Sequence, residues 1–189
     1  MGTMNASDAS DERLVTFLAG RTPQVTEPLT WGNALRFDVA VYLRAELPPL
    51  PLVTSVRAIV RREDSILVQR DRDSRHIIPG GRCEADEDPE ATLRREVREE
   101  TGWSIDRLTV LGFMHYHHLN PRPPDYAYPY PDFCQIVYAA WAVDLDESTV
   151  IDDAYVLGTE LVPVAEVQRM ALSQRERHLL GAALALGPP

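Results

Sequence analysis

The sequence predicts an α/β fold in which a mixed β-sheet is covered by helices, preceded by a short N-terminal extension. Two observations carry this prediction. Runs rich in β-formers return on both sides of one well-delimited helical segment at residues 89–101. Of the 189 residues, 44% are apolar and 25% charged, which suits one soluble domain with a real core.

The extension comes first. Residues 11–19 have an apolar side, which predicts a short amphipathic helix, and residues 35–43 alternate as a half-buried strand does. The proline-rich residues 47–51 form a stiff connection. We therefore expect an N-terminal extension, 1–50, and a main domain, 51–189. The extension can complete the sheet, cover the substrate or mediate a homodimer, and the sequence does not rank these roles.

The main domain begins with a predicted hairpin and continues with further strands around the central helix. Residues 53–60 and 65–69 are the two arms of that hairpin, with the turn at 61–64. The later predicted elements are strands at 108–116 and 133–143 and closing helices at 164–170 and 173–186.

The central helix has clear start and stop signals. Asp88 stands at the N-cap, Pro89 at the first helical position and Gly102 at the C-terminal stop. We therefore expect a helix over residues 89–101.

Composition limits the partners. The formal net charge is −10, and all 19 basic residues are arginines. An acidic chain is a poor candidate for an extended nucleic-acid surface or for an anionic membrane, although bound cations would let it take an anionic substrate. Cys83 and Cys134 lie far apart and are expected to be free thiols. With no signal-like start and no apolar run of about 20 residues, the expected location is cytoplasmic.

Three glutamates crowd one face of the predicted helix. Glu96, Glu99 and Glu100 fall within an arc of about 100°, next to an apolar stripe. They can form a solvated face eased by neighbouring arginines, or a site for a hard cation such as Mg²⁺, which prefers oxygen ligands. Spacing alone favours the solvated face.

The preceding glycines shift the balance toward a cation site. Gly80 and Gly81 let the backbone approach a ligand closely, so a main-chain carbonyl there can join a metal shell. Arg95 can pair with Glu87 and pin this loop to the helix. For the glycines by themselves, an ordinary tight turn is the commoner explanation.

Residues 81–103 resemble the Nudix box, Gly-x5-Glu-x7-Arg-Glu-U-x-Glu-Glu-x-Gly-U, in which U is a bulky apolar residue. Every specified position matches: Gly81, Glu87, Arg95-Glu96-Val97, Glu99-Glu100 and Gly102-Trp103. One departure is His76, near where many members carry tryptophan.

The resemblance to the Nudix hydrolase family implies an α/β/α sandwich from about residue 53 onward and a Mg²⁺- or Mn²⁺-dependent hydrolase. It implies that Glu96, Glu99 and Glu100 bind the metal with the Gly80 carbonyl, and that Arg95 and Glu87 hold the loop to the helix. Glu96 or Glu99 would handle the attacking water.

The resemblance also nominates one residue outside the box. Many members take a further glutamate from a loop just before a later helix, and Glu160 occupies a similar place here. It is therefore a candidate ligand or general base. A solvated loop acid is an equal alternative.

The substrate is left open by the sequence. Tyr126 and Tyr128 lie in the proline- and tyrosine-rich segment 120–132 and can stack on a base, although a stiff surface insertion explains the segment as well. Arg70 and Arg75 precede the glycine loop, as does Arg72, and are candidates for contact with a phosphate.

Three histidines, His115, His117 and His118, lie at the end of the strand predicted at 108–116. His115 and His117 share one face if that strand continues, which fits a phosphate contact or a transition-metal site. With no third ligand at a suitable sequence spacing, an ordinary strand end is the simpler explanation.

The predicted function is therefore metal-dependent hydrolysis of a phosphoanhydride bond in a nucleoside-diphosphate-linked small molecule. Two alternatives belong to other classes: a Nudix module that binds a nucleotide metabolite without cutting it, and an enzyme that processes RNA 5′ ends. The complete set of carboxylates disfavours the first, and the acidic composition disfavours the second.

Overall fold

The computed structural model describes residues 9–32, 34–71, 74–124, 126–151 and 156–187. The elements in chain order are α1 (Glu12–Leu18), β1 (Val25–Trp31), β2 (Leu35–Tyr42), η2 (Leu50–Leu52), β3 (Val53–Arg62), β4 (Ser65–Asp71), β5 (Arg75–His76), α2 (Pro89–Thr101), β6 (Trp103–His118), β7 (Asp132–Leu145), η3 (Glu147–Thr149), β8 (Val156–Pro163), α3 (Val164–Val167) and α4 (Gln174–Ala185).

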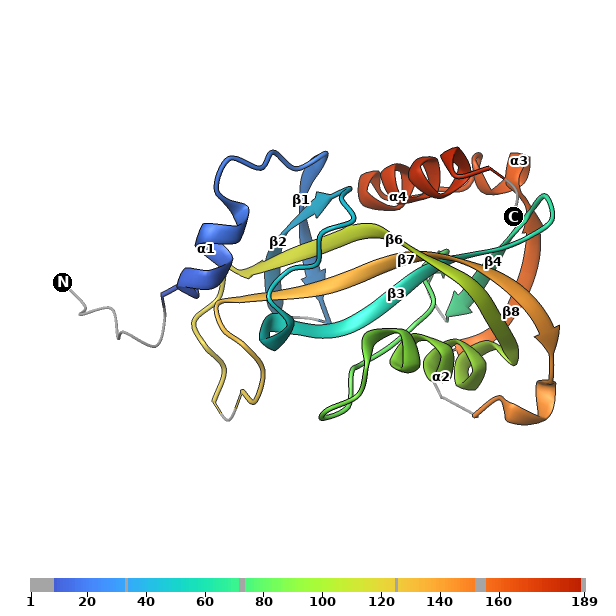
Figure 1. The fold of residues 1–189 in the computed structure, drawn as a ribbon, viewed down its shortest axis with the longest axis horizontal. Helices are drawn as coiled ribbons and strands as arrows, with labels where there is room; N and C mark the ends of the chain where they lie inside the picture. Colours follow the sequence, from blue (N-terminus) through green and yellow to red (C-terminus); the bar gives the residue numbers. More distant parts are fainter. Residues whose placement is uncertain (1–8, 33, 72–73, 125, 152–155, 188–189) are drawn as a thin grey trace.

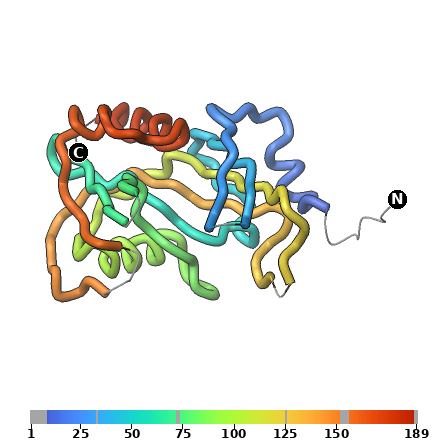
Figure 2. Tube along the Cα trace, turned by 180° about the vertical axis from the view of Figure 1, so that it is seen from behind, coloured from blue at the N-terminus to red at the C-terminus, as the bar shows by residue number. Residues whose placement is uncertain are grey.

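One mixed sheet organises the described strands (Figure 1). Its order is β1-β2-β6-β7-β3-β4-β5, and β8 pairs with β4. Strands β3 and β7 are parallel, whereas the other paired strands are antiparallel. Helices α2 and α4 cover opposite faces of the sheet, as both views show (Figures 1 and 2). The predicted α/β sandwich with a mixed sheet is confirmed.

Each face of the sheet has its own core. Leu93 and Val97 of α2 pack on alternate residues of β3 and β7, including Ala58 and Tyr138. The opposite core contains the apolar residues of α4 together with those of β2, β4 and β6. Period-two alternation along the strands produces this division, because successive side chains point to opposite faces.

Helix α2 begins and ends as its sequence signals predict. The Asp88 side chain accepts hydrogen bonds from the backbone amides of Glu90 and Ala91, and Pro89 occupies the first turn. Gly102 ends the helix in the left-handed conformation, with φ of 75°. A side chain at that φ would be strained, so glycine fixes both the end of α2 and the direction in which β6 leaves it.

The glycine loop fills a gap between two strands. β3 and β4 pair only next to their turn, at Arg61 with Ile66 and at Arg62 with Ser65. Farther along, the loop takes the place of β4: the amide of Val56 donates to the Gly81 carbonyl and that of Ala58 to the Pro79 carbonyl. The separation of β3 and β4 therefore carries Gly80 and Gly81 into the interior, beside α2.

The N-terminal extension contributes to the same sheet. β2 pairs with β6 over residues from Phe37 to Tyr42, and β1 is the outer strand, with Pro28 opposite Asp38. Phe37 is fully buried in the core that also contains Met114. Of the roles left open by the sequence, the extension completes the sheet. The domain boundary near residue 50 stays a prediction.

The structure differs from the predicted elements in two ways. Strands β1 and β8 were not predicted. Among the predicted elements, β6 begins earlier than expected, directly after Gly102, and α3 is shorter than the predicted helix. Glu160 lies within β8 opposite Val68 of β4, so its expected place in a loop is wrong. No helix among the described residues is long and apolar enough to span a membrane.

The buried position of Phe37 makes a prediction about the extension. Phe37→Ala should lower the free energy of unfolding of the whole protein by about 3–5 kcal/mol, because it leaves a cavity in the shared core. Leu47→Ala, at a side chain 39% exposed, is the control and should change stability by no more than about 0.5 kcal/mol. Urea unfolding followed by tryptophan fluorescence and circular dichroism would measure both. An unchanged main transition in Phe37→Ala would show that the extension unfolds separately.

Candidate active site

Helix α2 presents three carboxylates to one cavity. Glu96, Glu99 and Glu100 line a space of about 730 Å³ between α2 and β8, and Glu160 lines it from the β8 side. The remaining described wall is mostly apolar and is formed by Trp103, Leu145, Val150, Ile151, Val156, Leu157 and Leu161, with Thr101, Glu147, Gly158 and Thr159 between them. The four glutamates nominated as metal ligands therefore line the same cavity.

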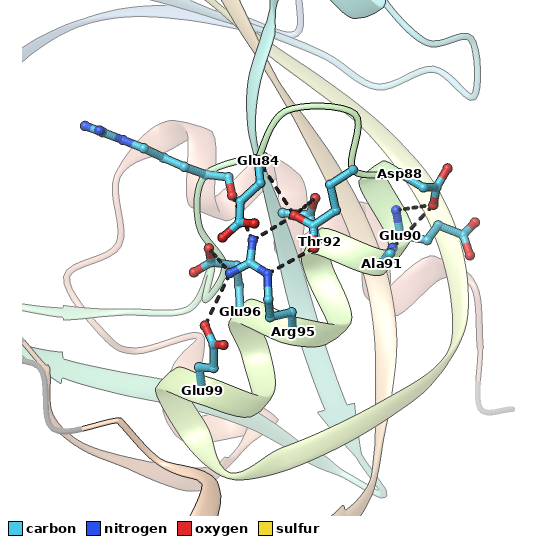
Figure 3. Close-up of polar contacts among 10 residues, drawn as sticks. Glu84, Asp88, Glu90, Ala91, Thr92, Arg95, Glu96 and Glu99 are labelled. Carbon is cyan, nitrogen blue, oxygen red and sulfur yellow. Dashed lines mark hydrogen bonds and ion pairs between the residues drawn. The ribbon is translucent and has the colours of Figure 1, made fainter.

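The guanidinium of Arg95 joins the loop to the helix (Figure 3). Its Nε donates to Oε1 of Glu87 at 3.0 Å, and its Nη2 donates to Oε2 at 2.8 Å. Nη1 donates to Oε1 of Glu96 at 2.8 Å and to Oε2 of Glu99 at 3.2 Å. Nη2 also reaches the carbonyl of Arg82 at 3.2 Å. One side chain thus contacts three of the box glutamates and the backbone of the glycine loop.

These contacts change the ionisation of the pair. The hydrogen bonds from Arg95 lower the pKa of Glu87 to about 2, and smaller contributions come from the Thr92 hydroxyl and the Glu84 amide. The same pairing raises the pKa of Arg95. Both groups are therefore charged throughout the neutral and mildly acidic range, and the pair is bidentate, which is the strongest form of this contact.

Gly81 leaves room for a carboxylate. A Cβ at this position would lie 1.9 Å from Oε2 of Glu96, far inside van der Waals contact. Gly80 has φ of 128°, and a Cβ there would lie 2.4 Å from the Val56 carbonyl oxygen. The two glycines are needed for different reasons. A side chain at position 80 would collide with the backbone of β3, and one at position 81 would collide with the Glu96 carboxylate.

Glu100 is the deeper acid of the set. Its Oε2 accepts hydrogen bonds from the backbone amide of Gly80 and from Nε2 of Gln69, each at 3.0 Å. Burial raises the pKa of Glu100, and the hydrogen bond from Gly80 and the nearby charge of Arg57 oppose that rise. Oε1 of Gln69 is buried without a hydrogen-bond partner among the described residues.

Arg57 belongs to the site and was missed from the sequence. Its guanidinium donates to the carbonyl of Gly80, the oxygen nominated as a metal ligand. A metal ion at that oxygen would have to share it with Arg57 or displace the arginine. The available signal was a charged residue inside the buried run of β3, and Gln69, 1% exposed in β4, gave a similar signal.

Arg70 and Arg75, nominated for contact with a phosphate, are not among the described residues that line the cavity. Nη2 of Arg75 donates to Oε1 of Glu160, so these two candidates pair with each other. Arg70 is exposed on β4. Arg72 lies outside the described residues.

The tyrosine-rich segment reaches the glycine loop. The Arg82 guanidinium lies over the ring of Tyr128, 4.7 Å from its centroid, and also donates to the Tyr128 hydroxyl. The Tyr126 hydroxyl lies 2.8 Å from Nε2 of His118. These contacts hold Tyr128, which is 36% exposed, beside Arg82, the residue that follows Gly81.

The donor set fits a hard divalent cation. Glu96 and Glu99 already share a positive charge, Nη1 of Arg95, and carboxylate oxygens are the ligands that Mg²⁺ prefers. In the part of the chain that the structure describes, no three acidic, histidine or cysteine side chains already enclose one point. A cation held by Glu96 and Glu99 would compete with Arg95 for their carboxylates.

Comparison with known proteins shows the family. The sequence model of the NUDIX domain matches residues 51–182, which is more than half of the chain. The protein therefore belongs to the NUDIX family.

One curated relative and two solved structures illustrate the likeness. A Bacillus subtilis (strain 168) protein named "Putative ADP-ribose pyrophosphatase YjhB" is 32% identical over 74 residues, which is 39% of this chain and 36% of that protein. The chain thus aligns with only about a third of that relative's length.

The structural matches support the fold. A mutant of the B. subtilis pyrophosphohydrolase BsRppH matches with a TM-score of 0.57 at 20% identity, over 79% of this chain and 90% of that one. A NUDIX hydrolase from Nitrosomonas europaea matches with a TM-score of 0.53 at 17% identity, over 70% and 89%.

The close approach at Gly81 predicts the effect of one methyl group. Gly81→Ala should leave the protein folded but displace the Glu96 carboxylate, lowering hydrolase turnover by about 100-fold, since a misplacement of about 1 Å at an active site has that scale of effect. Gly181→Ala is the control, because a Cβ there meets nothing within 4 Å and alanine favours the helix interior. Turnover in Gly81→Ala equal to that of Gly181→Ala would contradict the assigned role of Gly81.

The lowered pKa of Glu87 predicts a pH dependence of stability. A carboxyl whose pKa falls on folding stabilises the protein above its ordinary pKa, here 4.5, and this contribution disappears as the pH falls toward about 2. Glu87→Gln should therefore be less stable than wild type at pH 7, and the difference should shrink as the pH drops from 4.5 toward about 2. Urea unfolding at several pH values measures this, with Glu90→Gln as the charge control. A difference that stays constant with pH would argue against the ion pair.

Proposed function

We propose that this protein is an enzyme that hydrolyses a phosphoanhydride bond in a nucleoside-diphosphate-linked small molecule, using Mg²⁺ or Mn²⁺. The observation that carries the proposal is the convergence of Glu96, Glu99 and Glu100 on one cavity, with two of them already sharing a cationic nitrogen of Arg95. Membership of the NUDIX family supports the same reaction class.

The three acids are suited to different tasks. The cation, when bound, neutralises diphosphate oxygens and acidifies a coordinated water. Glu100 is buried and fixed by two hydrogen bonds, which suits a ligand that holds its position. The Glu99 side chain is 36% exposed, against 17% for Glu96. We assign Glu99 to orient and deprotonate the attacking water, because it is the more accessible to solvent.

Arg95 and Glu87 position the acids without touching the substrate. Their bidentate pair fixes the glycine loop to α2, so the loop backbone and the carboxylates keep one arrangement. Glu87 is held by Nε and Nη2 of Arg95, whereas Glu96 and Glu99 share Nη1, so the pair with Glu87 would persist if those two carboxylates held a cation.

Residues outside the cavity wall are proposed as candidate substrate contacts. Arg70 and Arg75 are exposed; Arg70 is paired with Gly158 of the wall in the β4–β8 register, and Arg75 contacts Glu160, which is a further candidate ligand or base. Tyr126 and Tyr128 are proposed to stack on a base, supported by the contact between Tyr128 and the glycine loop. The name of the B. subtilis relative makes ADP-ribose a sensible first compound to test.

The proposal is tested with a substrate panel and one carboxamide variant. ADP-ribose, other nucleoside-diphosphate derivatives and capped RNA would be incubated with Mg²⁺ or Mn²⁺, and phosphate release followed after phosphatase coupling. On the best substrate, Glu99→Gln should lower kcat by about 100-fold or more, because amide oxygen is a poor base and a weak ligand. Glu90→Gln, an exposed glutamate of the first turn of α2, should retain wild-type turnover.

Three outcomes would count against the proposal. Wild-type kcat in Glu99→Gln would remove Glu99 from the mechanism. Saturable nucleotide binding with no release of phosphate from any panel member would indicate a binding module, and cleavage confined to capped RNA would indicate an RNA-processing enzyme.

A further inference from the structure

A second polar cluster lies at the ends of β6 and β7 near α1, on the left in Figure 1 and away from the cavity beside α2. His117 of β6 is directly opposite Asp132 of β7 in the antiparallel register, and His115 is directly opposite Cys134. Residues two apart on a strand share a face, so both imidazoles and the carboxylate lie on the same side of the sheet.

Both histidines are directed at a single oxygen atom. Nε2 of His115 lies 2.7 Å from Oδ1 of Asp132, and Nδ1 of His117 lies 2.8 Å from the same oxygen. The sequence offered no third ligand to accompany the two histidines. The structure supplies one from the neighbouring strand, because the chain returns through the segment that joins β6 to β7.

The carboxylate at the centre is buried and charged. The Asp132 side chain is 3% exposed, and its Oδ2 has no hydrogen-bond partner of normal geometry among the described residues. The two imidazoles and the nearby hydroxyl of Ser10 contact this carboxylate. Its second oxygen, buried without a hydrogen-bond partner of normal geometry, could accept a further ligand contact.

We propose that His115, His117 and Asp132 bind a divalent transition-metal ion of the Zn²⁺ class. Two imidazole nitrogens and one carboxylate oxygen are a donor set that suits such ions, whereas Mg²⁺ prefers oxygen donors alone. The donor separations are 2.7 and 2.8 Å, whereas neighbouring ligands of a tetrahedral ion at about 2.1 Å are roughly 3.4 Å apart, so the donors would have to separate by about 0.6 Å.

In the structure, His115 and His117 contact Asp132 through hydrogen bonds, which differs from the arrangement that a bound metal ion would need. As placed, the described side chains form no group of three that could hold a metal ion. Binding would therefore require each histidine to present a lone pair in place of a shared proton and to move away from the carboxylate. His117, 43% exposed on its side chain, gives the ion access from solvent, while His115 and Asp132 form the buried part of the site.

A metal ion here would fasten the base of the tyrosine-rich segment. That segment leaves β6 directly after His118 and enters β7 at Asp132, so the three ligands lie on the two strands that it connects. Tyr128 of the same segment contacts Arg82 of the glycine loop. The inferred role is a structural clamp, and it does not depend on the proposed hydrolytic reaction.

The test uses the full-length protein, stripped with EDTA and dialysed, and titrated with Zn²⁺ in a calorimeter without nucleotide. Wild type should take up about one Zn²⁺ through this cluster, and its Tm should rise with added Zn²⁺ because the ion binds the folded state. His117→Ala should weaken that uptake by at least about 100-fold, since it removes one of three ligands. Cobalt(II) absorption bands that appear in wild type and vanish in His117→Ala would report imidazole ligation directly.

Three comparisons keep the test decisive. His178→Ala, which removes an exposed histidine of α4, and Glu99→Gln, which alters the carboxylate site, should both retain Zn²⁺ uptake. Asp132→Asn provides a second ligand variant if His117→Ala fails to fold. Unchanged uptake in His117→Ala, loss of uptake in Glu99→Gln instead, or no uptake by folded wild type would each overturn the proposal, whatever the hydrolysis assay shows.

Discussion

The ion pair between Arg95 and Glu87 is the contact on which the arrangement of the site depends. Without it, the loop that contains Gly81 would be tied to α2 only through weaker contacts, such as the bond from Gly80 to Glu100. Because the guanidinium is planar and offers five donors, it can hold Glu87 with one edge and still reach Glu96 and Glu99. Loop and helix therefore form one rigid unit.

The glycine loop can lie against α2 only because β3 and β4 separate at this point of the sheet. β3 and β4 separate after two paired residues on each strand, and the loop backbone takes over the hydrogen bonds of β3 that β4 leaves free. The polar groups of the site, Arg57, Gln69 and Glu100, meet where this replacement occurs. A continuous β3–β4 ladder would leave no space for them.

Local signals in the sequence were sufficient for the helix and its acids. Asp88, Pro89 and Gly102 delimit α2 through bonds and backbone angles that involve near neighbours, so their meaning is readable without the fold. The spacing of Glu96, Glu99 and Glu100 likewise follows from helical geometry alone. Features that depend on distant partners were not readable. The contact of Arg57 with Gly80 and that of Asp132 with His115 join residues from different strands and loops. Sequence spacing cannot reveal such contacts, because the register between strands decides them.

The outer position of β1 has a consequence for how copies of this protein can meet. At the outer edge of a sheet, free amides invite pairing with a strand of another molecule. Pro28 has no amide hydrogen, and it lies in the middle of β1. A neighbouring strand that extended the sheet there would lose one ladder hydrogen bond and meet the proline ring, so Pro28 disfavours edge-to-edge pairing at β1.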